Sequence, residues 1–117
     1  VPRQRLEVRS GEVSKGLTRR AGVYNHLKAR LGELKGMRGC ITLQAFAHRT
    51  TERVLGIEIN PRFGGGFPLT HAAGAHYGGW LIDEYLLDRA VPWFDGWTSD
   101  LLMLRYDAQI LIERSGG

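Results

Sequence analysis

The sequence predicts an α+β domain in which a mostly antiparallel sheet has helices packed on one face. Some segments alternate apolar and polar residues, which is typical of strands, and others repeat apolar residues every three or four positions, which is typical of helices. Six polar residues, HRTTER at 48–53, separate two strand-like segments and predict a hairpin between antiparallel strands. The expected order of elements is β-α-β-β-α-β.

The N-terminal part of the chain is expected to contain one strand, one loop and one helix. Arg5–Arg9 reads as a strand because Leu6 and Val8 share one of its faces. The following stretch, SGEVSKGLTRR, is rich in Gly, Ser, Thr and basic residues, and we expect a loop there. A helix that stops in KGMRG is predicted from one apolar stripe, formed by Val23, Leu27, Leu31 and Leu34.

The rest of the chain is expected to add three strands and one long helix. The two strands joined by the hairpin are Cys40–Ala47 and Arg53–Asn60. Leu69–Ala90 is predicted to be helical up to Pro92, although three glycines weaken helix propensity in its middle. Leu101–Ile112 is apolar, with β-branched residues towards its end, and predicts the last strand.

The composition fits one globular domain that spans residues 1–117. Hydrophobic residues make up 43% of the chain and charged residues 24%, which are ordinary values for a folded protein. No apolar run approaches the roughly 20 residues of a membrane-spanning helix, so we expect no membrane partner. The single cysteine, Cys40, excludes an internal disulfide and indicates a reducing, cytoplasmic compartment. Its place in an apolar run predicts a small buried thiol.

The net charge is +4, and much of the excess lies before the first predicted helix. A basic balance suits partners that carry phosphate, either nucleotides or nucleic acid. Scattered surface arginines are the plain alternative, and charge alone does not decide between them. The basic residues are Arg3, Arg5, Arg9, Lys15, Arg19 and Arg20.

A row of polar side chains lies at the end of the second hairpin strand, in the segment GIEINPRFGGGFP. Glu58 and Asn60 alternate with isoleucines and therefore project from the same face of the strand. Antiparallel pairing places Gln44, on the preceding strand, opposite or diagonal to Glu58. One carboxylate with amide oxygens is a ligand set that suits Mg²⁺. A half-exposed sheet face without a ligand is the alternative.

Arg62 and the glycines Gly64–Gly66 continue this row beyond the strand. The Arg62 guanidinium is a planar fork suited to a phosphate or an acyl phosphate. Glycines permit positive φ and a close approach of backbone to ligand. Together these features indicate a metal-bound polyphosphate, with a plain loop as the alternative.

Other sites have weaker support in the sequence. The segment GEVSKG lacks the spacing of a phosphate-binding loop of the Walker type. His71 and His76 are five residues apart and share no helical face, so we expect no zinc pair there. No Ser-His-Asp arrangement can be supported from the sequence.

The segment EINPRFGGGFPLTHAAGA resembles the metal-binding segment of ATP-grasp enzymes, particularly the branch similar to the large chain of carbamoyl-phosphate synthase. PRQRLEVRSGEVSKG resembles the strand and loop that open the second half of the ATP-grasp module. ITLQAFAH is similar to the strand that bears the glutamine, and LLMLRYD to the closing strand. The resemblance covers nearly the whole chain.

The resemblance implies an ATP-dependent ligase. Its implied ligands for Mg²⁺, which Mn²⁺ can replace, are Gln44, Glu58 and Asn60. Arg62 would be the catalytic residue that steadies the γ-phosphate or an acyl phosphate. Lys15 and Ser14, in the flexible loop, would lie near the ATP phosphates or the acceptor. ATP would activate a small carboxylate or a bicarbonate-like substrate to an acyl phosphate, which an amine then attacks.

Only the C-terminal half of an ATP-grasp module has a counterpart here. The half with the phosphate-covering loop and most of the adenine pocket is missing, and the chain begins without Met. We therefore expect a fragment of a longer enzyme that is inactive alone. The face that would meet the missing half should be exposed, and a homodimer through it is a further expectation.

A basic module without catalysis, which binds nucleic acid or another protein, is the alternative function. Its N-terminal arginines would hold phosphates. The aromatic residues needed to stack single-stranded bases are poorly placed for this, because Trp93, Phe94 and Trp97 cluster late in the chain. We do not expect nucleic acid as the partner.

Overall fold

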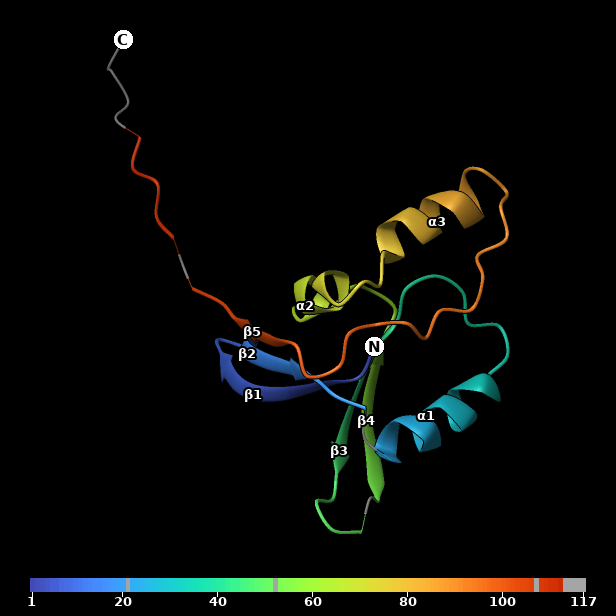
Figure 1. The fold of residues 1–117 in the computed structure, drawn as a ribbon, viewed down its shortest axis with the longest axis horizontal. Coiled ribbons are helices and arrows are strands. Elements are labelled where there is room, and N and C mark those ends of the chain that lie inside the picture. Colours follow the sequence, from blue (N-terminus) through green and yellow to red (C-terminus); the bar gives the residue numbers. More distant parts are fainter. Residues whose placement is uncertain (21, 52, 107, 113–117) are drawn as a thin grey trace.

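The computed structural model describes residues 1–20, 22–51, 53–106 and 108–112 (Figure 1). The elements, in chain order, are β1 (Arg3–Arg9), β2 (Glu12–Thr18), α1 (Gly22–Gly32), β3 (Thr42–Ala47), β4 (Val54–Asn60), α2 (Phe67–Ala72), α3 (Tyr77–Tyr85) and β5 (Leu102–Leu104). The α+β class is confirmed, and the strand pairs among the described residues are all antiparallel.

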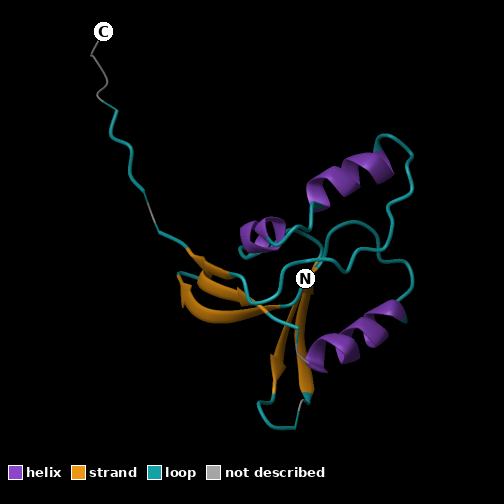
Figure 2. Ribbon diagram, in the orientation of Figure 1, coloured by secondary structure: helices purple, strands orange, loops and turns teal. Residues whose placement is uncertain are grey.

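The strands form two small sheets instead of the single sheet expected (Figure 2). One sheet has the order β1-β2-β5, and the other is the β3-β4 hairpin. Helix α2 packs on β2, where Cδ2 of Leu69 lies 3.2 Å from the position that a Cβ atom on Gly16 would take. The element order also differs from the expected one, because β2 is an added strand and the last helix is divided.

The expected loop after the first strand is wrong, because residues 12–18 form β2. Ser10 and Gly11 connect β1 to β2 with φ values of 48° and 81°, and such a two-residue turn matches the twist of a hairpin. Ser14, Gly16 and Thr18 alternate along β2 and are buried. The sequence concealed this strand because its buried face carries small residues instead of large apolar ones.

The expected helix Leu69–Ala90 is also wrong, because the chain breaks between α2 and α3. Gly74 has a φ of 100°, which a helix cannot contain. Its N–H donates to the carbonyl of His71 (2.9 Å), and the N–H of Ala75 donates to that of Thr70 (3.2 Å). The glycine therefore caps α2 and starts a new direction for α3.

The last strand is shorter than the expected Leu101–Ile112. Strand β5 pairs with β2 over three residues, and Arg105 N–H still donates to the Ser14 carbonyl at 2.8 Å. Residue 107 lies outside the described residues, and residues 108–112 lead away from the body of the molecule (Figure 1). Ile110–Ile112 are largely exposed, and they pair with no strand among the described residues.

Helix α1 is confirmed, and it is joined to the loop before β5. Leu27 and Leu31 of the predicted stripe are half-buried, whereas the side chain of Val23 lies outside the described structure. Tyr24 donates its hydroxyl hydrogen to Asp95 Oδ1 (3.0 Å) at the start of this helix. The Arg20 guanidinium donates to the same oxygen (3.1 Å) and lies 4.2 Å from the ring centre of Trp97.

The hydrophobic core is small for the length of the chain. Its buried apolar residues among those described are Leu69, Ala73, Ala75 and Trp97. The accessible surface is 9240 Å², whereas a compact monomer of 13.1 kDa would expose about 6,400 Å². Leu102 and Leu104, on the face of β5 that is shared with Lys15 and Leu17 of β2, are 51% and 62% exposed. These two leucines therefore leave one face of β5 uncovered in the described structure.

No helix in the described ranges combines the length and the apolar character needed to cross a membrane.

Candidate metal and phosphate site

Gln44 and Glu58 face each other across β3 and β4, and Thr42 faces Asn60 two residues further along. Directly opposed residues of an antiparallel pair project from the same face, so Gln44, Glu58 and Asn60 lie on one face. The pairing predicted from the sequence is confirmed. The register shifts between Gln44 and Ala45, so this regular row is confined to the end of the hairpin where β4 finishes.

The side chains of Gln44, Glu58 and Asn60 make no hydrogen bond or ion pair with any residue that the structure describes. Glu58 is exposed, whereas Nδ2 of Asn60 is buried and has no partner. A buried amide without a partner costs about 1–3 kcal/mol. A half-turn of this amide brings its oxygen to the same position. Asn60 therefore offers a polar group that a ligand can satisfy.

This ligand set fits a magnesium ion. Mg²⁺ usually takes one or two carboxylates from a protein and completes its shell with water and phosphate oxygens, and the row offers Glu58 with two amide oxygens. The described residues contain no group of three or more His, Cys, Asp or Glu side chains close enough to share a metal. The ring centres of His71 and His76 lie 4.8 Å apart. No third His, Cys, Asp or Glu among the described residues joins them as a metal ligand.

Arg62 lies in a turn that is tied to both strands of the hairpin. Its N–H donates to the Asn60 carbonyl (2.8 Å), and its own carbonyl accepts a hydrogen bond from the Thr42 hydroxyl (2.8 Å). The exposed guanidinium donates to the carbonyl of Phe63 at 3.1 Å. It has no acidic partner in the described residues. Its position is therefore fixed by the backbone, and most of its fork is free for an anion.

The positive φ expected for the three glycines is wrong. None of them has a positive φ, and each lies under a side chain from a different strand. The neighbours are Thr42 for Gly64, the Glu12 carboxylate for Gly65 and the Arg3 guanidinium for Gly66. A Cβ atom at Gly64 would press on the β-branched side chain of Thr42. At Gly65 and Gly66 it would meet only the far ends of the Glu12 and Arg3 side chains, which can move aside.

Ser14 and Lys15 lie in β2, not in a flexible loop, and both contact Glu7. The Ser14 hydroxyl donates to Glu7 Oε1 (2.9 Å), and the Lys15 ammonium pairs with Oε2. These two contacts, that of Lys15 first, hold the pKa of Glu7 at about 2. In the described structure no hydrogen bond or ion pair joins Ser14 or Lys15 to the row of Gln44, Glu58 and Asn60, called the metal row below. The hairpin thus places Gln44, Glu58 and Asn60 on one face and holds the backbone of Arg62 at its end, whereas Ser14 and Lys15 lie in the other sheet.

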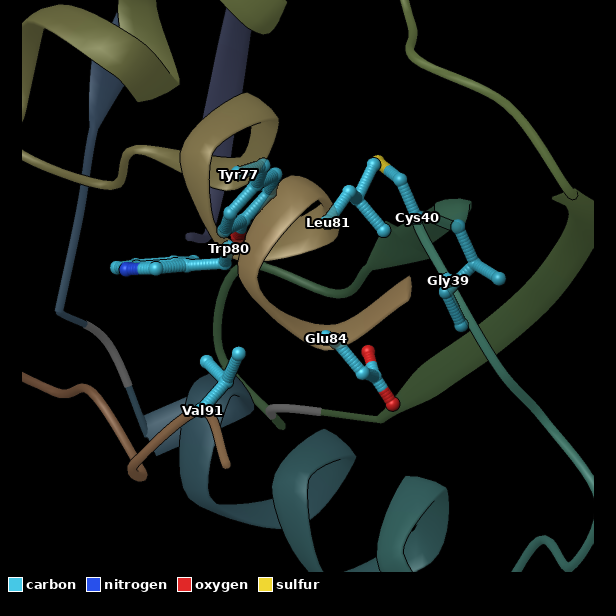
Figure 3. Close-up of a pocket in the computed structure, with 8 residues that line it drawn as sticks. Gly39, Cys40, Tyr77, Trp80, Leu81, Glu84 and Val91 are labelled. Carbon is cyan, nitrogen blue, oxygen red and sulfur yellow. The ribbon is translucent and has the colours of Figure 1, made fainter. Parts of the chain in front are cut away.

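A cavity of about 280 Å³ opens beside the start of β3, and sequence reasoning did not find it (Figure 3). Cys40 and Ile41 line one side, and Tyr77, Trp80, Leu81 and Glu84 of α3 line the other. Cys40 is half-buried and precedes β3, whereas a buried residue within a strand was expected. Burial raises the pKa of its thiol. The helix residues follow the spacing of one helical face, but nothing local indicated the opposite wall.

The chain matches no model of a known protein family, and no curated protein matches it.

Proposed function

We propose that this chain is the C-terminal half of an ATP-grasp ligase and carries its Mg²⁺- and phosphate-binding edge. The observation that supports this most is the row of Gln44, Glu58 and Asn60 on one sheet face. Their side chains are free of protein partners in the described structure, and Nδ2 of Asn60 is buried and unpaired. The resemblance of EINPRFGGGFP to the metal-binding segment of the family adds independent support.

In this proposal the β3-β4 ladder holds the three oxygen ligands at a fixed spacing. Paired residues on such a ladder have Cβ atoms about 4.5–5.5 Å apart, so Gln44 and Glu58 can serve one ion. Gln44, Glu58 and Asn60 would hold this ion, which would supply positive charge to the phosphates of ATP. Arg62 is the proposed catalytic residue, and its guanidinium would bind an oxygen of the transferred phosphoryl group or of the acyl phosphate.

The proposed reaction forms a carbon–nitrogen bond in two steps. A carboxylate or bicarbonate-like oxygen takes the γ-phosphoryl group of ATP, which gives an acyl phosphate and ADP. An amine then attacks the acyl carbon, and inorganic phosphate and a proton leave. The chain's own residues bind and orient the phosphates in both steps, which is how most of the stabilisation arises in phosphoryl transfer.

Exposed apolar side chains support a protein partner for this half-module. Leu102 and Leu104 of β5 are 51% and 62% exposed, and Phe46 and Leu55 of the β3-β4 hairpin are 65% and 70% exposed. Large apolar side chains that gather on exposed strands are typical of surfaces that another chain covers. We propose that the missing N-terminal half covers this surface in the parent enzyme, and that a second copy covers it when the chain is alone.

The alternative function as a basic nucleic-acid-binding module has less support. Most of the N-terminal basic residues are engaged within the chain. Arg9 and Lys15 pair with Glu7, and Arg20 pairs with Asp95. Arg3 donates to Thr70 Oγ1 at 2.6 Å. The three ion pairs reduce the free positive charge that a phosphate backbone would need, and the hydrogen bond holds Arg3 against α2.

Binding of Mn²⁺ with ATP to the 117-residue chain tests the proposal. The paramagnetic ion should broaden the amide NMR signals of Gln44, Glu58 and Asn60 first, and Glu58→Gln should remove this effect. Glu33→Gln is the control, because Glu33 is an exposed carboxylate at the end of α1. Equal broadening in the Glu58→Gln variant would overturn the metal assignment.

The half-module part of the proposal has its own test. With the adenine pocket absent, the isolated chain should bind ATP with a dissociation constant above about 1 mM. It should also show no turnover. Micromolar affinity in a calorimetric titration would contradict that part.

A further inference from the structure

The cavity beside β3 has the composition of a small-ligand site. Trp80 and Leu81 of α3 contribute apolar lining (Figure 3), and Ile41 adds to it. In the described structure, the backbone N–H and C=O groups of residues 39–41 make no hydrogen bond to other backbone groups. Apolar walls with a few free polar groups are typical of pockets that bind small molecules.

The charge of the cavity is set by Glu84. It is the only charged side chain among the described residues that line the cavity. Its nearest cation is Arg38, whose guanidinium lies 3.9 Å from Glu84 Oε1 and whose side chain is 71% exposed. Exposed pairs at such a distance contribute little, and Arg38 also stacks on Tyr85 at 5.2 Å.

Burial raises the pKa of the Cys40 thiol, so this group stays neutral at pH 7. The N-terminal amine of Val1 donates to the hydroxyl of Tyr77, which also lines the cavity, at 3.0 Å. Burial lowers the pKa of this amine to about 6, so it is mostly uncharged at pH 7. Glu84 therefore leaves the lining with a negative charge that favours a cation.

The cavity adjoins the end of the hairpin that carries the metal row. Ile41 lines the cavity, and the next residue, Thr42, is the partner of Asn60 in the ladder. The cavity is thus adjacent in the chain to the row of Gln44, Glu58 and Asn60.

We propose that this cavity binds a primary ammonium group carried on an apolar body, with Glu84 receiving the ammonium and Trp80 and Leu81 covering the body. Its further assignment as the subsite for the amine acceptor of the ligation rests on the proposed function. The binding of the ammonium compound does not, because it depends on none of the metal-row residues.

Three probes of matched size test the proposal by NMR on the 117-residue chain: 2-phenylethylamine, 2-phenylethanol and 3-phenylpropanoate. The indole N–H signal of Trp80 should shift when the amine is added. The amine should have a dissociation constant of about 1 mM, because the ligand is so small. Trp93 and Trp97 lie outside the lining and serve as internal references. The alcohol should bind about three- to fivefold more weakly, because it lacks the charge that Glu84 receives, and the carboxylate more weakly still.

Two variants test whether the Glu84 carboxylate attracts the ammonium group and whether Arg38 competes with it. Glu84→Gln should weaken the amine about three- to fivefold, down to the level of the alcohol, while the affinity for the alcohol stays unchanged. Arg38→Gln should strengthen the amine, because it removes the competing cation. Glu33→Gln is the matched control, since Glu33 forms a similar exposed pair with Arg30 (3.2 Å). It should leave the affinity for the amine unchanged.

The proposal is overturned if the carboxylate binds better than the amine, if Arg38→Gln weakens the amine, or if Glu84→Gln has no effect. The proposal is also overturned if none of the three probes changes the chemical shift of the Trp80 indole N–H. Glu58→Gln separates this result from the proposed function. That variant should lose the response to Mn²⁺ and keep amine binding, so each proposal can fail without the other.

Discussion

The Cγ2 methyl group of Thr42 lies 2.9 Å from the position that a Cβ atom on Gly64 would occupy. Thr42 cannot move aside easily, because its hydroxyl donates to the Arg62 carbonyl and its side chain is β-branched. The glycine therefore makes room for the contact that ties the turn of Arg62 to β3. A steric need, not a positive φ, explains this glycine.

Gly64→Ala should lower the free energy of unfolding by about 1–3 kcal/mol, as expected when a methyl group is forced into a filled space. Urea unfolding followed by circular dichroism measures this. Gly78→Ala is the control, because Gly78 lies within α3 and a Cβ atom there meets nothing within 4 Å. It should raise stability by about 0.5–1 kcal/mol. Similar effects of the two changes would contradict the steric role of Gly64.

Asn60→Leu should keep or increase stability while it removes the response to Mn²⁺. Leucine has nearly the same shape as asparagine and replaces a buried amide that has no partner in the described structure. Such an exchange is favourable for folding and unfavourable for a ligand site. A loss of more than about 2 kcal/mol in urea unfolding would instead assign Asn60 a structural role.

Glu7 should make the free energy of unfolding depend on pH in the acidic range. Its contacts with Lys15 and Ser14 lower its pKa from 4.5 to about 2 in the folded chain. The stabilisation from these contacts is thus complete above pH 4.5 and is lost as the pH falls from 4.5 to 2. Glu7→Gln should shift the urea midpoint at pH 7 and have a smaller effect at pH 3. A shift of equal size at both values would contradict the assignment.

The exposed face of β5 should cause the chain to associate. Leu102 and Leu104 project from it, and covering apolar surface contributes about 25 cal/mol per Å² before the cost of association. Light scattering should show a mass that rises with concentration. The double variant Leu102→Lys and Leu104→Lys should reduce the association. A monomer at high concentration for the unchanged chain would contradict this prediction.

Much of the candidate site followed from local patterns in the sequence. The alternation through Glu58 and Asn60 and the short polar loop after Ala47 were enough to predict the hairpin and the pairing with Gln44. Strand β2 was missed because its buried positions carry Ser14, Gly16 and Thr18, which give no apolar alternation. The break at Gly74 was missed because helix propensity alone does not show which glycine adopts a positive φ.

The sequence by itself determined the polar row, because side-chain direction along a strand repeats every two residues and depends on nothing distant. Only the tertiary structure decided the role of the glycines, since their neighbours Thr42, Glu12 and Arg3 come from three different strands. It also decided the cavity, whose walls at Ile41 and Trp80 are far apart in the chain. Contacts of this kind depend on how elements pack, and no periodicity within one segment encodes them.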